Sequence, residues 1–165
     1  MASSTGTLPE EGPWVQLPEE LLLKVLDELR WTRRDSGAVR GVCRRWRTAH
    51  DAGCKTLWVR NDVTEEVTCA LCGRMPALTR LNLTGVQSLN TEGLSAVGGL
   101  AALTWLDLTY CSNVTDVGLQ ELTSLTALSH VLLYGSFTTK IGRDALKAAI
   151  PGLRIHPSFL PVGAL

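Results

Sequence analysis

The stretch LTWLDLTYCSNVTDVGLQEL, residues 103–122, changes its apolar period part of the way along. Leu106 and Leu108 alternate with a polar residue, as in a strand, whereas Leu119 and Leu122 are three positions apart, as on a helix. The stretch therefore predicts a strand, a turn and a helix. A unit of this size cannot bury its own apolar face, so it needs neighbours of the same kind.

Copies of this unit recur along the chain. Similar hexamers start at Leu78 (LTRLNL), Leu103 (LTWLDL) and Leu128 (LSHVLL), and the interval between consecutive starts is the same. A degenerate copy precedes them at residues 57–71, and one of ambiguous register follows near Leu153. A fixed period of this length is the signature of stacked repeats, whose outer units are usually atypical. The sequence thus predicts about five units.

The repeats resemble leucine-rich repeats, and LDLTYCSNVTDVGLQEL resembles the cysteine-containing type found in F-box proteins. The resemblance covers about residues 57–156 and implies an α/β fold: a short right-handed solenoid with parallel strands on the concave face and helices on the convex side. Leu103, Leu106 and Leu108 would then point into the stack. Cys111 would lie where the chain leaves the strand, as a small and soft buried side chain.

Polar and glycine residues mark the ends of the helical segments. Thr115 and Asp116 precede a helix expected to begin near Val117, and their side-chain oxygens suit the free N–H groups of its first turn. We therefore expect both residues to cap this helix. Gly98 and Gly99 lie at the end of the preceding helical segment, where glycine commonly terminates helices.

Residues 14–58 do not follow the repeat. LPEELLLKVLDEL starts at Leu17 with a proline suited to the first turn of a helix, and Glu19 and Glu20 complement the positive end of its dipole. On a helical projection, the apolar side chains cover a stripe of roughly 140°. Two shorter helices are expected in RWTRRDSGAVRGVCRRWRTAH, residues 30–50. Segments this small cannot bury so much apolar surface among themselves, so either the repeats or a partner must cover it.

The order and spacing of LPEELLLKVL, an Asp-led middle segment, VCRRWR and a closing LW resemble the F-box. An F-box followed by cysteine-type leucine-rich repeats implies a substrate receptor of an SCF-type cullin–RING ubiquitin ligase. In that family the F-box docks on a Skp-type adaptor, which joins it to the cullin scaffold, and the repeats hold the protein to be ubiquitinated. The resemblance implies adaptor contacts at Leu17, Pro18, Leu21, Leu22, Val25, Leu26, Val42, Cys43 and Trp46. The middle segment DSGAVRGV departs from the pattern, because it has two glycines and few large apolar residues.

These inferences divide the chain into a disordered leader at residues 1–13, an F-box at 14–58, and leucine-rich repeats with a C-terminal tail at 59–165. The leader has neither an arginine nor a long apolar run, and five cysteines, an odd number, indicate free thiols in a reducing compartment. We expect a cytoplasmic or nuclear location. The alternative reading is a repeat scaffold for protein interaction whose N-terminal helices only cap the array.

Residues between the inward leucines point to the outer face of the strands. This face is the expected site for a protein substrate, whose identity the sequence leaves unknown. The predicted substrate contacts are Arg80, Asn82, Trp105, Asp107, His130, Leu132 and Tyr134; Thr84, Thr109, Arg154 and His156 share the face. We expect Trp105, His130, Leu132 and Tyr134 to form an exposed, partly aromatic column. The alternative is that Trp105 packs on neighbouring strands or beneath the C-terminal tail.

The charge and the apolar pattern of the chain argue against nucleic-acid binding and against a membrane span. The chain has 16 basic and 16 acidic residues, so its charge does not indicate a nucleic-acid partner. The arginines between residues 30 and 47 are interpreted as a solvated face, or as a surface that steers docking of an acidic partner. No apolar run approaches the length of a membrane span.

We expect a non-catalytic chain without a metal or cofactor. The CALC motif places Cys69 and Cys72 at metal-ligand spacing, but no second pair of ligands follows, so both are interpreted as small apolar residues of a helix. The three histidines, His50, His130 and His156, lie in separate units, and none has a nucleophile at a telling spacing.

Overall fold

The computed structural model describes residues 48, 51–59 and 61–156. The chain divides into two compact units, Met1–Gly53 and Cys54–Leu165. Nearly all described residues belong to the second unit, so the account of the fold concerns that unit alone. The leader, the C-terminal tail and the three predicted N-terminal helices lie outside the described residues, except that Thr48, in the segment of the third helix, is described and is helical.

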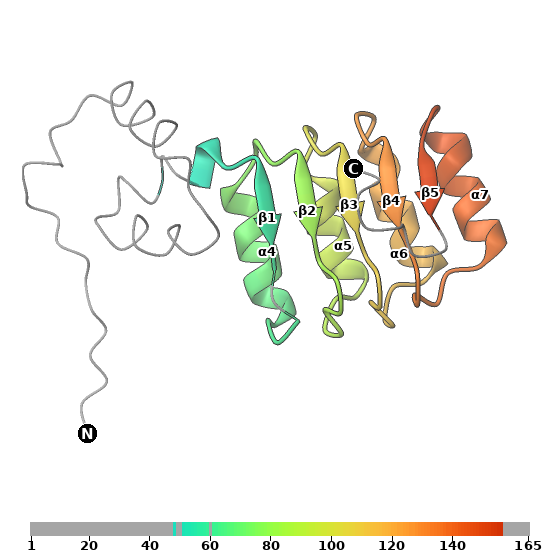
Figure 1. Cartoon of the computed structure of the whole chain (residues 1–165), viewed down its shortest axis with the longest axis horizontal. Coiled ribbons are helices and arrows are strands. Elements are labelled where there is room, and N and C mark those ends of the chain that lie inside the picture. Colours follow the sequence, from blue (N-terminus) through green and yellow to red (C-terminus); the bar gives the residue numbers. More distant parts are fainter. Residues whose placement is uncertain (1–47, 49–50, 60, 157–165) are drawn as a thin grey trace, which may run out of the picture. The chain divides into compact units, whose positions relative to one another are not determined.

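The second unit alternates short strands with helices along the chain (Figure 1). The strands are β1 (Thr56–Trp58), β2 (Arg80–Asn82), β3 (Trp105–Asp107), β4 (His130–Leu132) and β5 (Arg154–His156). The helices are α4 (Glu65–Arg74), α5 (Thr91–Gly98), α6 (Asp116–Gln120) and α7 (Lys140–Ala149), and a short 3-10 helix, η2 (Glu121–Ser124), follows α6 directly.

The strands form one parallel sheet in chain order, β1-β2-β3-β4-β5. This sheet confirms the predicted mixed α/β class. One residue from the middle of each strand pairs with its counterpart in the next, and these residues are Leu57, Leu81, Leu106, Val131 and Ile155. The interval between paired positions is constant from β2 to β4 and shorter by a single position at both ends of the sheet. The register near Leu153 looked ambiguous in the sequence because the last interval is the shorter one.

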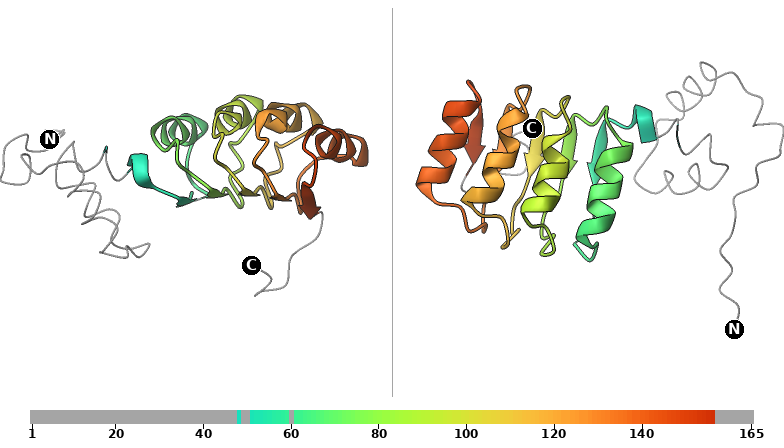
Figure 2. Two further views of the ribbon diagram at one scale, coloured as in Figure 1. Left: turned by 90° about the horizontal axis from the view of Figure 1, so that it is seen from above. Right: turned by 180° about the vertical axis from the view of Figure 1, so that it is seen from behind.

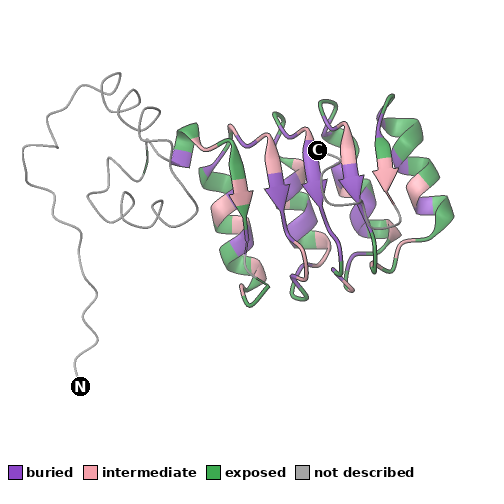
Figure 3. Cartoon of the chain, viewed as in Figure 1, coloured by how far each residue is buried: buried purple, intermediate pink, exposed green. Residues whose placement is uncertain are grey.

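The helices cover one face of the sheet, and the core lies between the two layers (Figure 2). Leu103, Leu106 and Leu108 are fully buried there, as predicted. The whole of β3 is buried (Figure 3). Cys111 is also fully buried, and its thiol donates a hydrogen bond to the backbone oxygen of Leu83 at 3.0 Å. The prediction that this cysteine points into the stack is therefore confirmed, and its hydrogen bond ties one repeat to the previous one.

The turn after each of three successive strands contains a residue with positive φ. Gly85, Tyr110 and Gly135 occupy this position in successive repeats, with φ values of 75°, 59° and 71°. Glycine adopts this backbone conformation without a steric penalty, whereas a side chain with a Cβ does not. The central repeat therefore holds a tyrosine where its neighbours have glycine.

Acidic residues in the first turn of one helix hold the start of a later one. The Glu65 carboxylate of α4 accepts hydrogen bonds from the Asn90 side chain at 2.6 Å and from the Gly93 backbone N–H at 2.8 Å, at the start of α5. The Asp116 carboxylate of α6 accepts from the backbone N–H and the hydroxyl of Thr139, which precedes α7, at 2.7 and 2.6 Å. These bonds satisfy donors at a helix N-terminus that its own backbone leaves free.

The expected capping of α6 is wrong in one respect. Thr115 is the N-cap residue, but its side chain makes no capping hydrogen bond, and Asp116 bonds to the next repeat instead. The hydrogen bonds from the side chain and backbone of Thr139 lower the pKa of Asp116. The carboxylate thus stabilises the contact between repeats rather than its own helix.

The expected helix ends agree better with the structure. Gly98 is the last residue of α5 and Gly99 is its C-cap, as predicted. In the part of the chain that the structure describes, no helix combines the length and apolar character needed to span a membrane.

Candidate partner-binding face

Side chains of the five strands alternate between the core and the face of the sheet opposite the helices. We call this opposite surface the strand face. It consists of two in-register rows. The first row is Thr56, Arg80, Trp105, His130 and Arg154, and the second is Trp58, Asn82, Asp107, Leu132 and His156. All the predicted substrate contacts except Tyr134 lie in these rows, so the structure brings them onto one surface.

The expectation that Trp105 and Leu132 are exposed is wrong. Trp105 is only 6% exposed and Leu132 only 8%. The Arg80 guanidinium lies over the Trp105 ring, with its carbon 5.0 Å from the ring centroid. In-register neighbours on a sheet are about 5 Å apart, so long side chains of adjacent strands close over one another. Trp105 is therefore buried by its neighbours in the same row of the strand face.

Trp105 carries a buried polar atom that no described residue pairs with. Its indole nitrogen has almost no contact with solvent and no hydrogen-bond acceptor among the described residues. An unmade hydrogen bond at a buried donor costs about 1–3 kcal/mol. The strand face therefore contains one N–H group that an acceptor from another molecule would satisfy.

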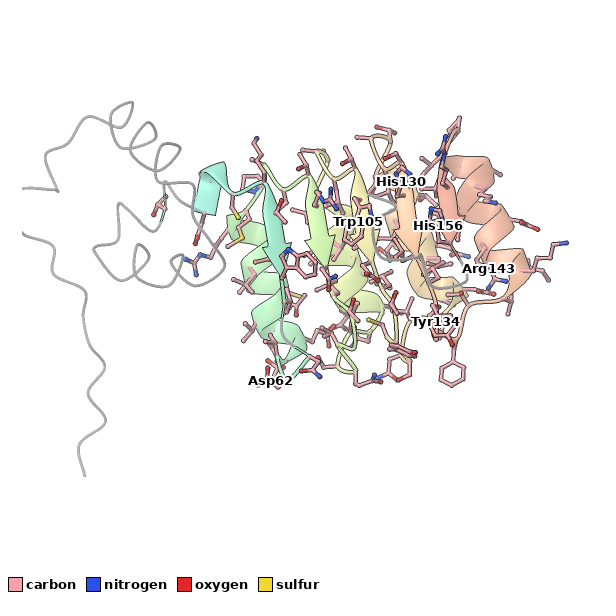
Figure 4. The ribbon with its side chains drawn as sticks, in the orientation of Figure 1. Asp62, Trp105, His130, Tyr134, Arg143 and His156 are labelled. Carbon is pink, nitrogen blue, oxygen red and sulfur yellow. The ribbon has the colours of Figure 1, made fainter. Side chains whose placement is uncertain are left out.

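Two histidines stack at the β4–β5 end of the strand face. The rings of His130 and His156 are parallel, with centroids 5.7 Å apart (Figure 4). His130 also shares a hydrogen bond of 3.0 Å with the Ser129 hydroxyl. The Nε2 atom of His156 is buried, and no described residue forms a hydrogen bond with it. Burial lowers the pKa of His156, and the nearby charges of His130, Arg154 and Lys147 lower it further.

A polar ladder occupies the middle of the second row. The Asn82 side-chain amide donates to the Asp107 carboxylate at 3.4 Å, and both residues are buried. The other oxygen of Asp107 accepts from the Thr109 N–H at 2.9 Å, and the Asn82 oxygen accepts from the Thr84 N–H at 3.0 Å. Asn82 and Asp107 thus fix the turn that follows each strand, which gives them a structural role.

Tyr134 lies beside the strand face rather than in it, in the turn after β4. It is 38% exposed, as predicted, and its ring packs edge to face against Tyr110 at a centroid distance of 5.2 Å. The same turn region exposes Phe137. Sequence reasoning missed Tyr110 as an exposed aromatic residue. Its alignment with Gly85 and Gly135, at the same position of the preceding and following repeats, is the signal that could have found it.

Three of the described cysteines, Cys69, Cys72 and Cys111, are poor nucleophiles and metal ligands because their thiols have raised pKa values. Burial raises the pKa of Cys72 to about 12 and that of Cys111 to about 11. Burial also raises the pKa of Cys69, and both cysteines of the CALC motif lie in α4, as expected. Within residues 51–59 and 61–156, no group of three His, Cys, Asp or Glu side chains is arranged to hold a metal ion.

The predicted adaptor contacts belong to the first unit. They are Leu17, Pro18, Leu21, Leu22, Val25, Leu26, Val42, Cys43 and Trp46, and all of them lie outside the described residues. Their role as adaptor contacts stays a prediction.

Comparison with known families identifies the N-terminal part of the chain. Residues 14–63 match the family model described as F-box-like. An F-box-like domain indicates a role in protein–protein interaction, typically binding to a Skp-type adaptor. No match to the chain was found among curated proteins. The matched segment extends through β1, the first strand of the sheet.

Proposed function

We propose that this chain is the substrate-recognition subunit of an SCF-type cullin–RING ubiquitin ligase. Its F-box-like domain would dock on a Skp-type adaptor, and its leucine-rich repeats would hold a protein substrate. The observation that carries the proposal is the F-box-like match at residues 14–63, followed by a separate stack of regular repeats. Such a protein would act in the cytoplasm or nucleus.

The mechanism requires no chemistry from this chain. Simultaneous binding of adaptor and substrate raises the effective concentration of substrate lysines near the charged ubiquitin carried by the ligase. The gain in rate comes from proximity and orientation. The chain would therefore be a non-catalytic subunit, and ubiquitin transfer should require the adaptor, the cullin and the RING subunit.

The apolar stripe of the first predicted helix would form the centre of the adaptor interface. A few large buried side chains supply most of the binding energy of such interfaces. Leu21 and Leu22 lie within this stripe, whereas the same helical projection places Asp27 on the opposite side. These positions provide a test variant and a matched control in one helix.

Adaptor binding is tested by co-expression with a Skp-type adaptor and gel filtration. We expect the wild-type chain to elute with the adaptor and to aggregate more when it is expressed alone. The double variant Leu21→Arg/Leu22→Arg should lose co-elution, because it places charges in an apolar interface. The control Asp27→Arg should retain it. Equal solubility with and without adaptor, and no co-elution, would instead favour a repeat scaffold whose N-terminal helices are only a cap.

A further inference from the structure

The strand face carries an excess of positive charge. Arg80, His130, Arg154 and His156 line it, and Asp107 is the acidic residue of its two rows. Among the described residues, no carboxylate forms an ion pair with Arg80 or Arg154. Asp107 is buried and already accepts two hydrogen bonds, from Asn82 and Thr109. Two arginines and two histidines therefore face a surface with little negative charge available to them.

We infer that this strand face binds an acidic peptide segment of a partner protein, with carboxylates of Asp or Glu held between Arg80 and Arg154. The inference rests on the proposed function, because it names the class of substrate that the repeats would recognise. Complementary charges across an interface favour the right partner and speed its docking. A planar guanidinium also matches a carboxylate with two parallel hydrogen bonds.

Two buried polar atoms on this face, the Trp105 indole N–H and the His156 Nε2 atom, lack hydrogen-bond partners among the described residues. Trp105 lies on β3, between the strands of the two arginines, and His156 lies on β5 with Arg154. Arg80 lies over the ring of Trp105, so movement of its guanidinium onto a carboxylate would expose part of the indole to the bound peptide. A peptide oxygen could then accept from the indole N–H. Binding would in this way remove a hydrogen-bond deficit that the free protein bears.

The dimensions of the face suit a short extended peptide. Arg80 is on β2 and Arg154 on β5, three strand spacings away, which corresponds to about 14 Å. An extended peptide covers this distance with about four residues. Trp105 and Leu132 provide an apolar floor between the charged ends. The site therefore fits a compact acidic segment rather than a large folded surface.

Protonation of His156 should couple to peptide binding. Burial lowers the pKa of His156, and then the charges of His130, Arg154 and Lys147 lower it further. Arg80 adds to the positive charge of the same face, and Asp107 opposes it. A bound carboxylate favours the protonated imidazole, so binding raises the pKa of His156 and takes up a proton. Affinity should therefore increase as the pH falls through the pKa of the bound state, and it should level off below the pKa of the free state.

Fluorescence anisotropy on the full chain tests the inference directly. The probe is a fluorescein-labelled peptide, Gly-Glu-Glu-Asp-Glu-Glu-Gly, with both ends blocked, and its matched control replaces the acids with Gln and Asn. We expect saturable binding of the acidic peptide alone. Its affinity should be at least about threefold higher near pH 6 than near pH 7.5, since histidine titrates in this range.

Variants distinguish a defined site from general charge attraction. Arg80→Gln and Arg154→Gln should each weaken binding about fivefold, the effect of one exposed ion pair. His156→Gln should remove most of the pH dependence. The control Lys140→Gln removes one positive charge from the exposed side of α7 and should leave binding unchanged. Circular dichroism verifies that each variant is folded.

Three results would overturn the inference: equal binding of both peptides, equal loss with Lys140→Gln, or much tighter binding of a phosphoserine peptide than of the acidic one. The last would assign the face to a phosphorylated partner. Co-elution of the same variants with the adaptor separates this test from that of the proposed function. Failure of peptide binding with intact co-elution rejects only the acidic-peptide site, whereas peptide binding without co-elution rejects only the ligase assignment.

Discussion

At the scale of single residues, the positive-φ position in the turn after each of three successive strands shows how neighbouring residues change the energetic cost of a side chain. Gly85, Tyr110 and Gly135 all have positive φ. A residue with a Cβ loses about 1–2 kcal/mol in this conformation. Tyr110 offsets part of that loss by packing edge to face on Tyr134, which contributes about 0.5–1.5 kcal/mol. The contact between the two tyrosines therefore compensates in part for the backbone strain at Tyr110.

Alanine at the two glycines should separate backbone strain from crowding. A Cβ on Gly85 would make an ordinary contact of 3.4 Å with Asn61, so Gly85→Ala should cost only the strain, about 1–2 kcal/mol. A Cβ on Gly135 would lie 2.6 Å from the ring of Tyr110. Gly135→Ala should therefore cost more, about 2–4 kcal/mol in total. Urea denaturation measures both free energies of unfolding.

A further variant controls for this interpretation. Gly152 also has a positive φ, 86°, but a Cβ at this residue would have no atom within 4 Å. Gly152→Ala should therefore match Gly85→Ala. If Gly135→Ala were no more destabilising than these two, the contact with Tyr110 would carry no energetic weight.

At the scale of elements, the distance between neighbouring helices depends on one small residue. Gly73 in α4 and Gly98 in α5 occupy the same position of consecutive repeats. A Cβ on Gly98 would lie 2.4 Å from the backbone oxygen of Glu121, at the start of η2. A Cβ on Gly73 would meet nothing within 4 Å. Packing therefore requires a glycine at this repeat position in α5 but not in α4.

Replacing these glycines should have opposite effects on stability. Gly98→Ala should destabilise the protein by about 1–3 kcal/mol, because backbone must move to accommodate the methyl group. Gly73→Ala should stabilise it by about 0.5–1 kcal/mol, since alanine favours the helix and limits the unfolded chain. Thermal unfolding measured by circular dichroism reports both changes. Equal shifts of the same sign would mean that the close approach of α5 and η2 does not constrain the sequence.

Helix starts provide a second link between repeats. Glu65 and Asp116 each bond to the beginning of a helix in the next unit. A lowered pKa keeps Asp116 charged at neutral pH, and this contribution to stability is lost as the pH falls through the lowered value. Acid should therefore loosen the contact between α6 and α7.

At the scale of the whole stack of repeats, burial of the strand residues decreases from the central strand toward both ends of the sheet. All three residues of β3 are buried, whereas β1 and β5 contain none that are buried (Figure 3). Stacked repeats are stabilised by contacts between nearest neighbours, so terminal units open first. The order of opening is therefore set by position in the stack.

Hydrogen exchange should follow this order. We expect amides of β3 to exchange at least about tenfold more slowly than those of β1 and β5. Leu106→Ala, in the centre of the core, should cost about 2–5 kcal/mol and accelerate exchange in every strand. Leu57→Ala, in the partly buried β1, should accelerate it mainly there. Uniform acceleration by both variants, measured by mass spectrometry, would show that the stack unfolds as a single unit.

The sequence by itself determined the repeat and the apolar row that fills the core, and its resemblance to leucine-rich repeats implied the parallel strands. Once the strands are parallel, side chains at a fixed spacing must face the same way. It also indicated the F-box-like segment, through the order and spacing of LPEELLLKVL, VCRRWR and LW. The direction of Cys111 followed from its place at the end of a strand, and the structure confirms that it is buried.

Only the tertiary structure decided how exposed the outer face is and which groups meet there. Alternation placed Trp105 and Leu132 on that face but could not show that neighbouring side chains bury them. The Arg80–Trp105 contact and the stack of His130 on His156 join residues from different strands. A period fixes the direction of a side chain along its own strand, whereas burial and charge depend on side chains a whole repeat away. The physical reason is that these contacts exist only once the strands have paired.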